Sequence, residues 1–251
     1  MKSENDSGRP ASSHAVDLSL IIPAYNEAQR IAATLAEARG YLEGKGLSFE
    51  LLVGADGTDG TREIVREMAR TDARIQVFGS AERRGKGHAI REGVALARGR
   101  FIGFADADGK TPLAEFDRVR PHLEAGADLV IGSRRHKDTR IENPQPWYRQ
   151  IGSKVFALFM HPILGLWDIT DTQCGFKFFQ HAAAKDLFRR QFVDGYIYDV
   201  EILFLARRRG YRIVQVPVRW RDDGDSRLDL VRGNAQCFWD VVRIRFHRYP
   251  D

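Results

Sequence analysis

The chain has little cysteine and no long apolar run, and each absence narrows the class of protein it can be. Its two cysteines, Cys174 and Cys237, lie far apart, which argues against a disulfide framework or a zinc cluster and predicts a reducing compartment. No stretch reaches the roughly 20 apolar residues that span a bilayer. The nearest, residues 155–167, is shorter and contains His161 and Pro162. We therefore expect no membrane-spanning helix.

Lysine and glutamate are missing from the last part of the chain. From Arg207 onward there are eleven arginines and six aspartates, so this tail alone carries +5, which equals the net charge of the whole chain. Because the guanidinium group bonds phosphate oxygens in pairs, such a tail favours phosphate or an anionic surface as its partner. A solvated, salt-bridged surface is the alternative that composition leaves open.

Several enzyme signatures are also missing. No G-x-G-x-x-G follows the first apolar segment, which argues against a dinucleotide-dependent dehydrogenase, and no G-x-S-x-G elbow is present. A near P-loop starts at Gly79, but its spacing to Gly85 is one residue too long and Gly87 replaces the serine or threonine. Arg84 and Lys86, flanked by glycines, could still approach a diphosphate, although a basic turn before a helix explains them equally well.

Short apolar segments alternate with helical patterns through the first 135 residues, which predicts an α/β fold with a mostly parallel sheet and helices on both faces. Pro23 is expected to stop the first strand, Thr61 to cap a helix, and Gly99 to close another. Ligands of such sheets bind beyond the carboxyl ends of the strands, where the polar motifs of this chain begin. The expected strands are residues 18–22, 49–61 (which ends in a turn), 74–78, 101–109 and 128–135, and the expected helices are 31–43, 61–71 and 88–99.

After residue 136 the pattern loosens, and residues 136–150 are expected to form a loop. An apolar helix, a strand, a helix and a strand are predicted to follow. In the last segment Phe238, Val242 and Phe246 recur at four-residue spacing among arginines, which is typical of an interfacial amphipathic helix, although a docked helix would look similar. The predicted organisation is a disordered leader (1–16), a catalytic domain (17–220) and a basic amphipathic segment at the membrane surface (221–251).

The pair Asp106 and Asp108 ends an apolar strand. Residues i and i+2 of a strand point the same way, so both carboxylates could face one point. Two hard oxygen ligands suit Mg²⁺ or Mn²⁺, which bind through one or two carboxylates and a substrate's phosphates. An EF-hand is excluded because Lys110 stands where a third ligand is needed. The polar end of a strand is the simpler alternative.

Three further acidic residues have structural alternatives. Asp171 is interpreted as a turn former, a helix cap or a catalytic carboxylate. Asp199 and Glu201 open a predicted helix, where carboxylates favour the helix dipole in any case.

Together the motifs resemble glycosyltransferase family 2, the inverting transferases of GT-A fold that use a nucleotide-activated sugar. The segments IIPAYNE, RGKGHAIREG, FADADG, VIGSR, TDTQCGFKFF and YDVEILFLARRRGY occur in the family's order. Within it, DADG followed by DTQCGFK and DVEIL is most similar to the dolichyl-phosphate β-glucosyltransferases and their prokaryotic polyprenyl-phosphate relatives. The resemblance implies transfer of a sugar, glucose favoured, from a UDP-sugar to a polyprenyl phosphate.

The resemblance also implies a role for individual residues. A phosphate acceptor is already a dianion and needs no base, so Asp171 would orient groups; a hydroxyl acceptor would require it as the base. The implied sets are Asp108, Asp171 and Arg134 for catalysis; Pro23, Tyr25, Glu27, Asp56, Lys86 and Asp106 for the nucleotide-sugar; Ser133, Arg134, Gln173 and Arg227 for the acceptor phosphate; and Asp106 and Asp108 for Mg²⁺ or Mn²⁺.

The chain departs from the family pattern in its first loop, where Ala55, Asp56 and Gly57 replace the usual D-D-G, and after the aspartate pair, where Gly109 and Lys110 favour a glucosyl donor. The alternatives are a GDP-mannose donor, a hydroxyl acceptor, or an inactive nucleotide-binding scaffold. The implied partners are a nucleotide-sugar, a polyprenyl phosphate and the anionic cytoplasmic face of a membrane, with no nucleic acid; a homo-oligomer or a membrane-bound partner is left open.

Overall fold

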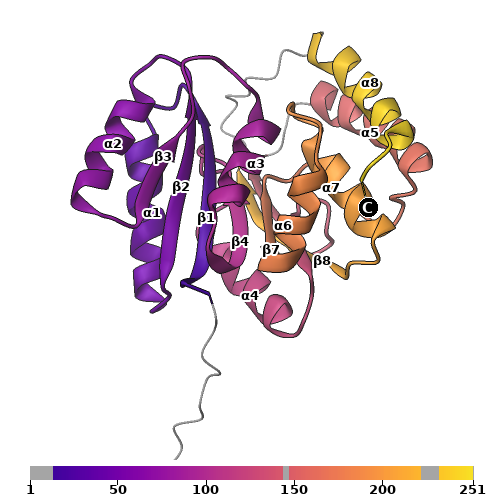
Figure 1. Ribbon diagram of the computed structural model, residues 1–251. Coiled ribbons are helices and arrows are strands. Elements are labelled where there is room, and N and C mark those ends of the chain that lie inside the picture. Colours follow the sequence, from indigo (N-terminus) through magenta and orange to yellow (C-terminus); the bar gives the residue numbers. More distant parts are fainter. Residues whose placement is uncertain (1–13, 144–146, 222–231, 251) are drawn as a thin grey trace, which may run out of the picture.

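The computed structural model describes residues 14–143, 147–221 and 232–250 (Figure 1). Its centre is a seven-stranded sheet in the order β3-β2-β1-β4-β7-β5-β8. All neighbouring pairs are parallel except those of β7, which runs antiparallel to β4 and β5. The predicted α/β fold with a mostly parallel sheet is confirmed. The strands are β1 (Val16–Tyr25), β2 (Phe49–Asp56), β3 (Ile75–Phe78), β4 (Gly99–Ala105), β5 (Leu129–Ser133), β7 (Phe176–Gln180) and β8 (Ile213–Pro217).

Helices cover both faces of this sheet (Figure 1). One apolar core joins α1, α2 and α4 to one face, and a second joins α3, α5, α6, α7 and α8 to the other. Because side chains alternate along a strand, Leu20 of β1 enters the first core while Ile21 enters the second. The helices are α1 (Ile31–Gly44), α2 (Thr61–Thr71), α3 (Lys86–Leu96), α4 (Phe116–Glu124), α5 (Trp147–Leu164), α6 (His181–Arg190), α7 (Tyr198–Arg208) and α8 (Arg232–Phe246), with a 3-10 turn η1 (Leu113–Glu115).

Residues 136–150 hold regular structure that the local sequence pattern does not predict. Strand β6 (Arg140–Asn143) pairs in parallel with β9 (Arg219–Arg221) in a separate two-stranded sheet, so the expectation of a loop there is wrong. Its partner lies about 80 residues away in the sequence, and a local pattern carries no sign of such a pairing. Helices α4 and α6 were not predicted either; α4 contains Pro121, which obscures its pattern.

Several predicted boundaries are wrong, three of them at residues that were expected to stop or cap an element. Strand β1 continues through Pro23, because its pairing with β4 ends at Ile21 while that with β2 runs on, and a proline is tolerated where one side of a strand is unpaired. Thr61 is the first residue of α2 and not its cap, since its hydroxyl bonds Asp59. Gly99 does not close α3 but begins β4, where a Cβ would lie 2.4 Å from the backbone nitrogen of Ser19.

The C-terminal helix α8 is docked on α5. The ring of Phe238 lies 4.7 Å from that of Phe159 and 5.6 Å from that of Phe156, and Val241 and Ile244 are fully buried. The inner face of α8 is therefore packed against the protein, as in the docked helix that the sequence pattern left open as an alternative. Within the described ranges, no helix combines the length and the apolar character that crossing a bilayer requires.

Candidate active site

Asp106 and Asp108 lie in a turn beyond the carboxyl end of β4, the central strand of the sheet, which ends at Ala105. The prediction that a strand over residues 101–109 orients both carboxylates is therefore wrong. The hydroxyl of Thr34 in α1 donates to the carbonyl of Ala107 at 2.8 Å, which ties the turn to that helix. The backbone N–H of Lys110 donates to Asp108 Oδ1 at 3.2 Å. Both aspartates therefore belong to a turn that is hydrogen-bonded to α1 and within itself.

The charges of this turn suit a divalent cation. Burial and the neighbouring carboxylate of Asp106 raise the pKa of Asp108. Lys86, in the first turn of α3, binds Asp106 Oδ1 at 2.5 Å. Burial opposes the charge of Lys86, but Asp106 and Asp199 outweigh it and raise the pKa of this lysine. Two mutually repelling carboxylates with hard oxygen ligands fit Mg²⁺ or Mn²⁺.

The chain supplies only part of a coordination shell. In the described part of the chain, no cluster of three or more histidine, cysteine or acidic side chains is arranged to hold a metal ion. Mg²⁺ usually takes one or two protein carboxylates and completes its shell with phosphate oxygens and water. Asp106 and Asp108 thus fit a cation that arrives together with a diphosphate.

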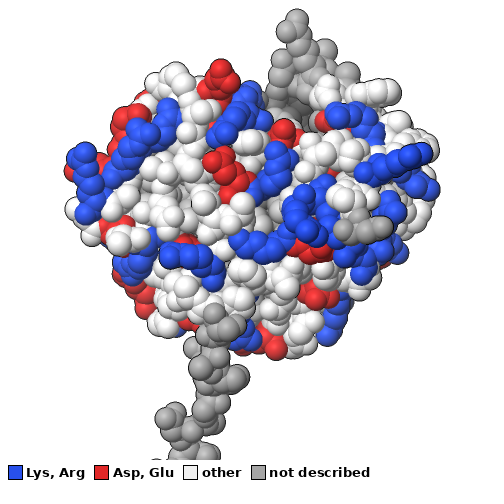
Figure 2. Space-filling model, viewed as in Figure 1, with Lys and Arg blue, Asp and Glu red and all other residues white. Residues whose placement is uncertain are grey.

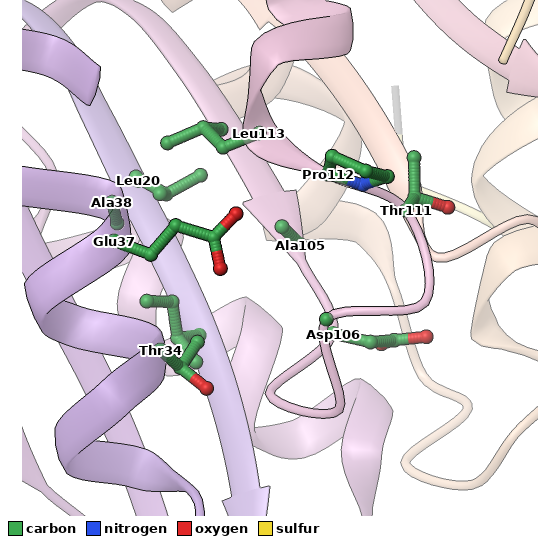
Figure 3. A pocket seen from close by; sticks show the side chains of 11 residues that line it. Leu20, Thr34, Glu37, Ala38, Ala105, Asp106, Thr111, Pro112 and Leu113 are labelled. Carbon is green, nitrogen blue, oxygen red and sulfur yellow. The ribbon is translucent and has the colours of Figure 1, made fainter. Parts of the chain in front are cut away.

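A small hollow lies behind this turn, between α1 and the loop that leads to η1 (Figure 3). The carboxylate of Glu37 points into the hollow, whereas the side chain of Asp106 turns away from it (Figure 3). Leu20 of β1 and Leu113 of η1 form its apolar wall. Asp106 thus lines the hollow while its carboxylate faces away from it.

Asp56, at the end of β2, shapes the loop that precedes α3. Its carboxylate is buried and accepts the backbone N–H groups of Ser80 at 3.1 Å and Arg84 at 3.0 Å. The following Gly57 has a φ of +107°, and a side chain there would collide with Asn26. The altered first loop is thus a well-bonded turn, and the contact of Asp56 with a nucleotide base stays a prediction.

Tyr25, at the end of β1, contacts Arg83, which is not among the site residues predicted from the sequence. The guanidinium carbon of Arg83 lies 4.5 Å from the centre of the Tyr25 ring, and Arg83 donates a hydrogen bond of 2.8 Å to the Tyr196 hydroxyl. Arg83 stands beside the chosen Arg84 in the same basic motif, but only the fold brings Tyr196 to it. A cation over an aromatic face is a favourable contact.

Arg134 and Asp171 form a bidentate ion pair. The Nε and Nη2 atoms of Arg134 donate to the two carboxylate oxygens at 2.7 and 2.9 Å, and its backbone N–H donates at 2.9 Å. Although burial acts in the opposite direction, these contacts lower the pKa of Asp171 to about 2. Asp171 is therefore ionised near neutral pH and is a very weak base.

The remaining predicted site residues differ in burial and in their hydrogen-bond partners. Ser133 is fully buried and its hydroxyl lies 2.9 Å from that of Thr170. The backbone N–H of Gln173 donates to Asp171 at 3.3 Å, and that of Glu27 donates to Thr61. Pro23 lies within β1, and Arg227 falls outside the described residues. Their roles toward ligands stay predictions.

The fold is that of the nucleotide-sugar transferases of GT-A type. The structure of glucosyl-3-phosphoglycerate synthase from Mycobacterium tuberculosis with UDP matches with a TM-score of 0.69 and 21% identity, covering 94% of this chain and 82% of that one. Another structure of that synthase, with Mn²⁺, UDP and glucosyl-3-phosphoglycerate, matches with a TM-score of 0.65 and 19% identity, over 92% and 80% of the two chains. At these identities the likeness concerns the fold alone.

The sequence defines the family. The model of glycosyl transferase family 2 matches residues 19–188, and this chain belongs to that family and is a glycosyltransferase. A dolichyl-phosphate beta-glucosyltransferase of Trichomonas vaginalis is 33% identical, over 90% of this chain and 70% of the relative. The enzyme of the same name from Dictyostelium discoideum is 34% identical, over 91% and 74%. The predicted family resemblance is confirmed.

Proposed function

We propose that the protein transfers glucose, with inversion, from UDP-glucose to a polyprenyl phosphate of the dolichyl type. The relatives that match nearly the whole chain carry the name dolichyl-phosphate beta-glucosyltransferase. The observation that carries the proposal is the pairing of Asp171 with Arg134, which leaves this carboxylate too weak a base to activate a hydroxyl. A phosphate acceptor needs no such activation.

The acceptor itself supplies the nucleophile. A phosphate monoester has its second pKa at about 6, so a polyprenyl phosphate is largely a dianion at neutral pH. One of its oxygens attacks the anomeric carbon as the bond to the diphosphate breaks. Asp171 orients Arg134 through its Nε and Nη2 atoms, and the Nη1 atom of Arg134 donates a hydrogen bond to the incoming phosphate. The protein's contribution is then positioning and charge stabilisation.

The departing diphosphate lies, in this proposal, over Asp106 and Asp108. These carboxylates would hold Mg²⁺ or Mn²⁺, which when bound neutralises the charge that develops on the diphosphate. Lys86 binds Asp106 and thereby sets the position of its carboxylate. Tyr25, Asp56 and the loop before α3 would form the nucleotide pocket.

A surface on α5 and α8 is suited to the membrane that holds the lipid acceptor. The two helices pack on each other through phenylalanines and expose other large apolar side chains outward. On α5 these recur at four- and three-residue spacing, which places them on one face of the helix. This α5–α8 surface consists of Ile151, Val155 and Leu158 on α5, Trp167 just after it, and Trp239 and Phe246 on α8.

Basic side chains accompany this surface. Arg243, Arg245 and Arg248 are exposed on and after α8, and Figure 2 shows lysine and arginine side chains on the side of the molecule formed by α7 and α8. Each basic residue near an anionic leaflet contributes about 1 kcal/mol to binding. We infer peripheral binding at the cytoplasmic face, with residues 17–220 as the catalytic domain and 221–251 as its basic surface segment.

The edge of the sheet that holds Arg134 is hydrogen-bonded to the α5–α8 surface through Arg135. Arg135, the residue after Arg134, donates hydrogen bonds to the hydroxyl of Ser153 in α5 and to the carbonyl of Thr170. The helix that exposes Leu158 is thus held directly beside the candidate acceptor site. This connection would bring a phosphate at the membrane surface toward Arg134 while its lipid chain stays in the bilayer.

A transfer assay tests the reaction. Purified protein is given radiolabelled UDP-glucose or GDP-mannose, a polyprenyl phosphate and Mg²⁺ or Mn²⁺, with Asp108→Ala as the inactive control. Label should enter the lipid from UDP-glucose. Transfer only from GDP-mannose would replace the donor, transfer only to water-soluble hydroxyl acceptors would replace the acceptor, and no binding of either nucleotide-sugar would indicate a scaffold.

A further inference from the structure

A lysine of β7 is buried in the middle of an aromatic strand. Lys177 stands between Phe176 and Phe178 and is fully inaccessible to solvent. Its Nζ donates to Asp199 Oδ1 at 2.9 Å and to the carbonyl of Cys174 at 2.6 Å. A buried ion pair often adds little to stability compared with apolar residues of similar size. Its presence behind the candidate active site therefore calls for another explanation.

One side of this pair leads to Asp106 through the backbone. The Cys174 carbonyl that Lys177 holds immediately precedes Gly175. A Cβ atom on Gly175 would lie 2.1 Å from Asp106 Oδ2, so the Asp106 carboxylate rests directly on this stretch of backbone. Lys177 thus fixes the wall against which the candidate metal ligand lies.

The other side leads to Asp106 through α7 and α3. Asp199 and Tyr198 form the first turn of α7. A Cβ atom on Gly87 of α3 would lie 2.7 Å from Tyr198 Cβ, so the first turns of the two helices are in close contact. The residue before Gly87 is Lys86, which binds Asp106 at 2.5 Å. Both routes from the buried pair end at the same carboxylate.

The charges along the second route alternate in sign. Lys177 is followed by Asp199, then by Lys86, then by Asp106. Although burial acts in the opposite direction, Asp106 and Asp199 together raise the pKa of Lys86.

We propose that Lys177 and Asp199 are a positioning pair, which holds Asp106 through Gly175 and Lys86 in the geometry that receives a divalent cation and its diphosphate. The inference rests on the proposed use of Asp106 as a metal ligand. Neither residue touches substrate in this role, because both are buried. Residues that orient a metal ligand typically change metal affinity by about 10–100-fold when they are replaced.

The first test neutralises the pair. In Lys177→Met/Asp199→Asn both charges are removed together, which avoids an unpaired buried charge. The dissociation constant of UDP, measured calorimetrically with Mn²⁺, should rise about 10–100-fold, with little change when EDTA replaces the metal. The matched control is Asp186→Asn/Arg190→Met, an ion pair with a buried arginine in α6, which should bind as the wild type does.

A second variant tests the same inference without changing a charge. Gly175→Ala places a methyl group against the Asp106 carboxylate at a residue whose φ is not left-handed. Its Mn²⁺-dependent affinity for UDP should fall in the same way, while its circular dichroism stays that of the wild type. The control is Gly40→Ala in α1, where a Cβ meets nothing within 4 Å. If the double variant does not fold, unchanged binding by Gly175→Ala still overturns the inference.

The outcomes separate the two proposals. A wild-type protein that binds no UDP with Mn²⁺ would overturn the proposed function and this inference with it. A wild type that binds, together with a folded double variant or Gly175→Ala that binds equally well, would overturn this inference alone. Weaker binding in the control variants as well would also overturn it, because the effect would then be general.

Discussion

Arg134 binds Asp171 through two parallel hydrogen bonds of 2.7 and 2.9 Å, so the two side chains act as one unit at the edge of the sheet. Replacing Arg134 by lysine keeps the charge but removes the fork. A hydrogen bond to a charged group is worth about 1.5–3 kcal/mol, so we expect the KM for polyprenyl phosphate to rise roughly 10–100-fold. The affinity for UDP, measured separately by calorimetry, should not change; an unaltered KM would contradict the assignment.

The same pair predicts the shape of the pH–rate profile. Because the pKa of Asp171 is lowered to about 2, its carboxylate stays ionised throughout the range in which the enzyme can be assayed. Asp171→Asn should therefore lower transfer by a similar factor at every pH between about 5 and 9. A wild-type profile with an acidic limb that disappears in this variant would show instead that Asp171 is a base.

Asp108 predicts opposite effects on stability and on activity. Its pKa is raised by burial and by Asp106, so the ionised carboxylate is unfavourable when no cation is present. Asp108→Asn should unfold at the same temperature as the wild type or slightly higher in EDTA, and should lose the stabilisation that Mn²⁺ and UDP together give the wild type. Thermal unfolding under both conditions measures this, and an equal ligand-induced shift in the variant would exclude Asp108 as a ligand.

Glu201 predicts a pH dependence of folding. This carboxyl group is buried in α7, and although it accepts the N–H groups of Phe192 and Val193, burial raises its pKa from 4.5 to about 7. The native protein thus holds the proton more tightly than the unfolded chain. The stabilisation is complete below pH 4.5 and is lost as the pH rises through 7, by about 3 kcal/mol in total.

Urea unfolding of Glu201→Gln checks this. The variant cannot titrate, so its free energy of unfolding relative to the wild type should rise by about 3 kcal/mol between pH 4.5 and pH 8. The exposed Glu63→Gln in α2 serves as the control and should show no such change. A constant difference between Glu201→Gln and the wild type would mean that Glu201 titrates normally.

The α5–α8 surface predicts binding to anionic vesicles that weakens with salt. Leu158→Asp and Trp239→Asp each place a charge among exposed apolar side chains and should reduce co-sedimentation with phosphatidylserine vesicles. Leu96→Asp, at an exposed apolar residue at the end of α3, is the control. Equal binding to neutral vesicles, or unchanged binding by both variants, would contradict a role for this surface.

Local patterns sufficed to predict most strands and the residues at their ends. The apolar run before Asp106 and the helical spacing after residue 31 reflect burial in a two-sided sheet, which leaves a direct trace in the sequence. The antiparallel direction of β7 and the pairing of β6 with β9 left none, since they depend on distant partners.

In the candidate site, too, some residues could be predicted from local patterns and others could not. Asp106 and Asp108 could be selected from their spacing, whereas Lys177 could not, because its partner Asp199 is 22 residues away and reaches it only in the folded chain. A lysine inside an aromatic strand was the available signal. The sequence predicts only a helix-dipole role for Asp199, because nothing near it in the chain points to its bond with the buried Lys177.

The reversed direction of β7 has a consequence for how this protein can vary. A strand that runs against its neighbours begins at the edge where they end, so the chain leaves β5 at Arg134 and returns before Phe176 on the same side of the sheet. The intervening segment, which contains α5, therefore leaves the central sheet and returns to it at the same edge. Its outer face can change without shifting the register of the seven strands of the central sheet, as long as β6 keeps its pairing with β9. Under the proposed function, the surroundings of the acceptor can then diverge while the donor site stays constant.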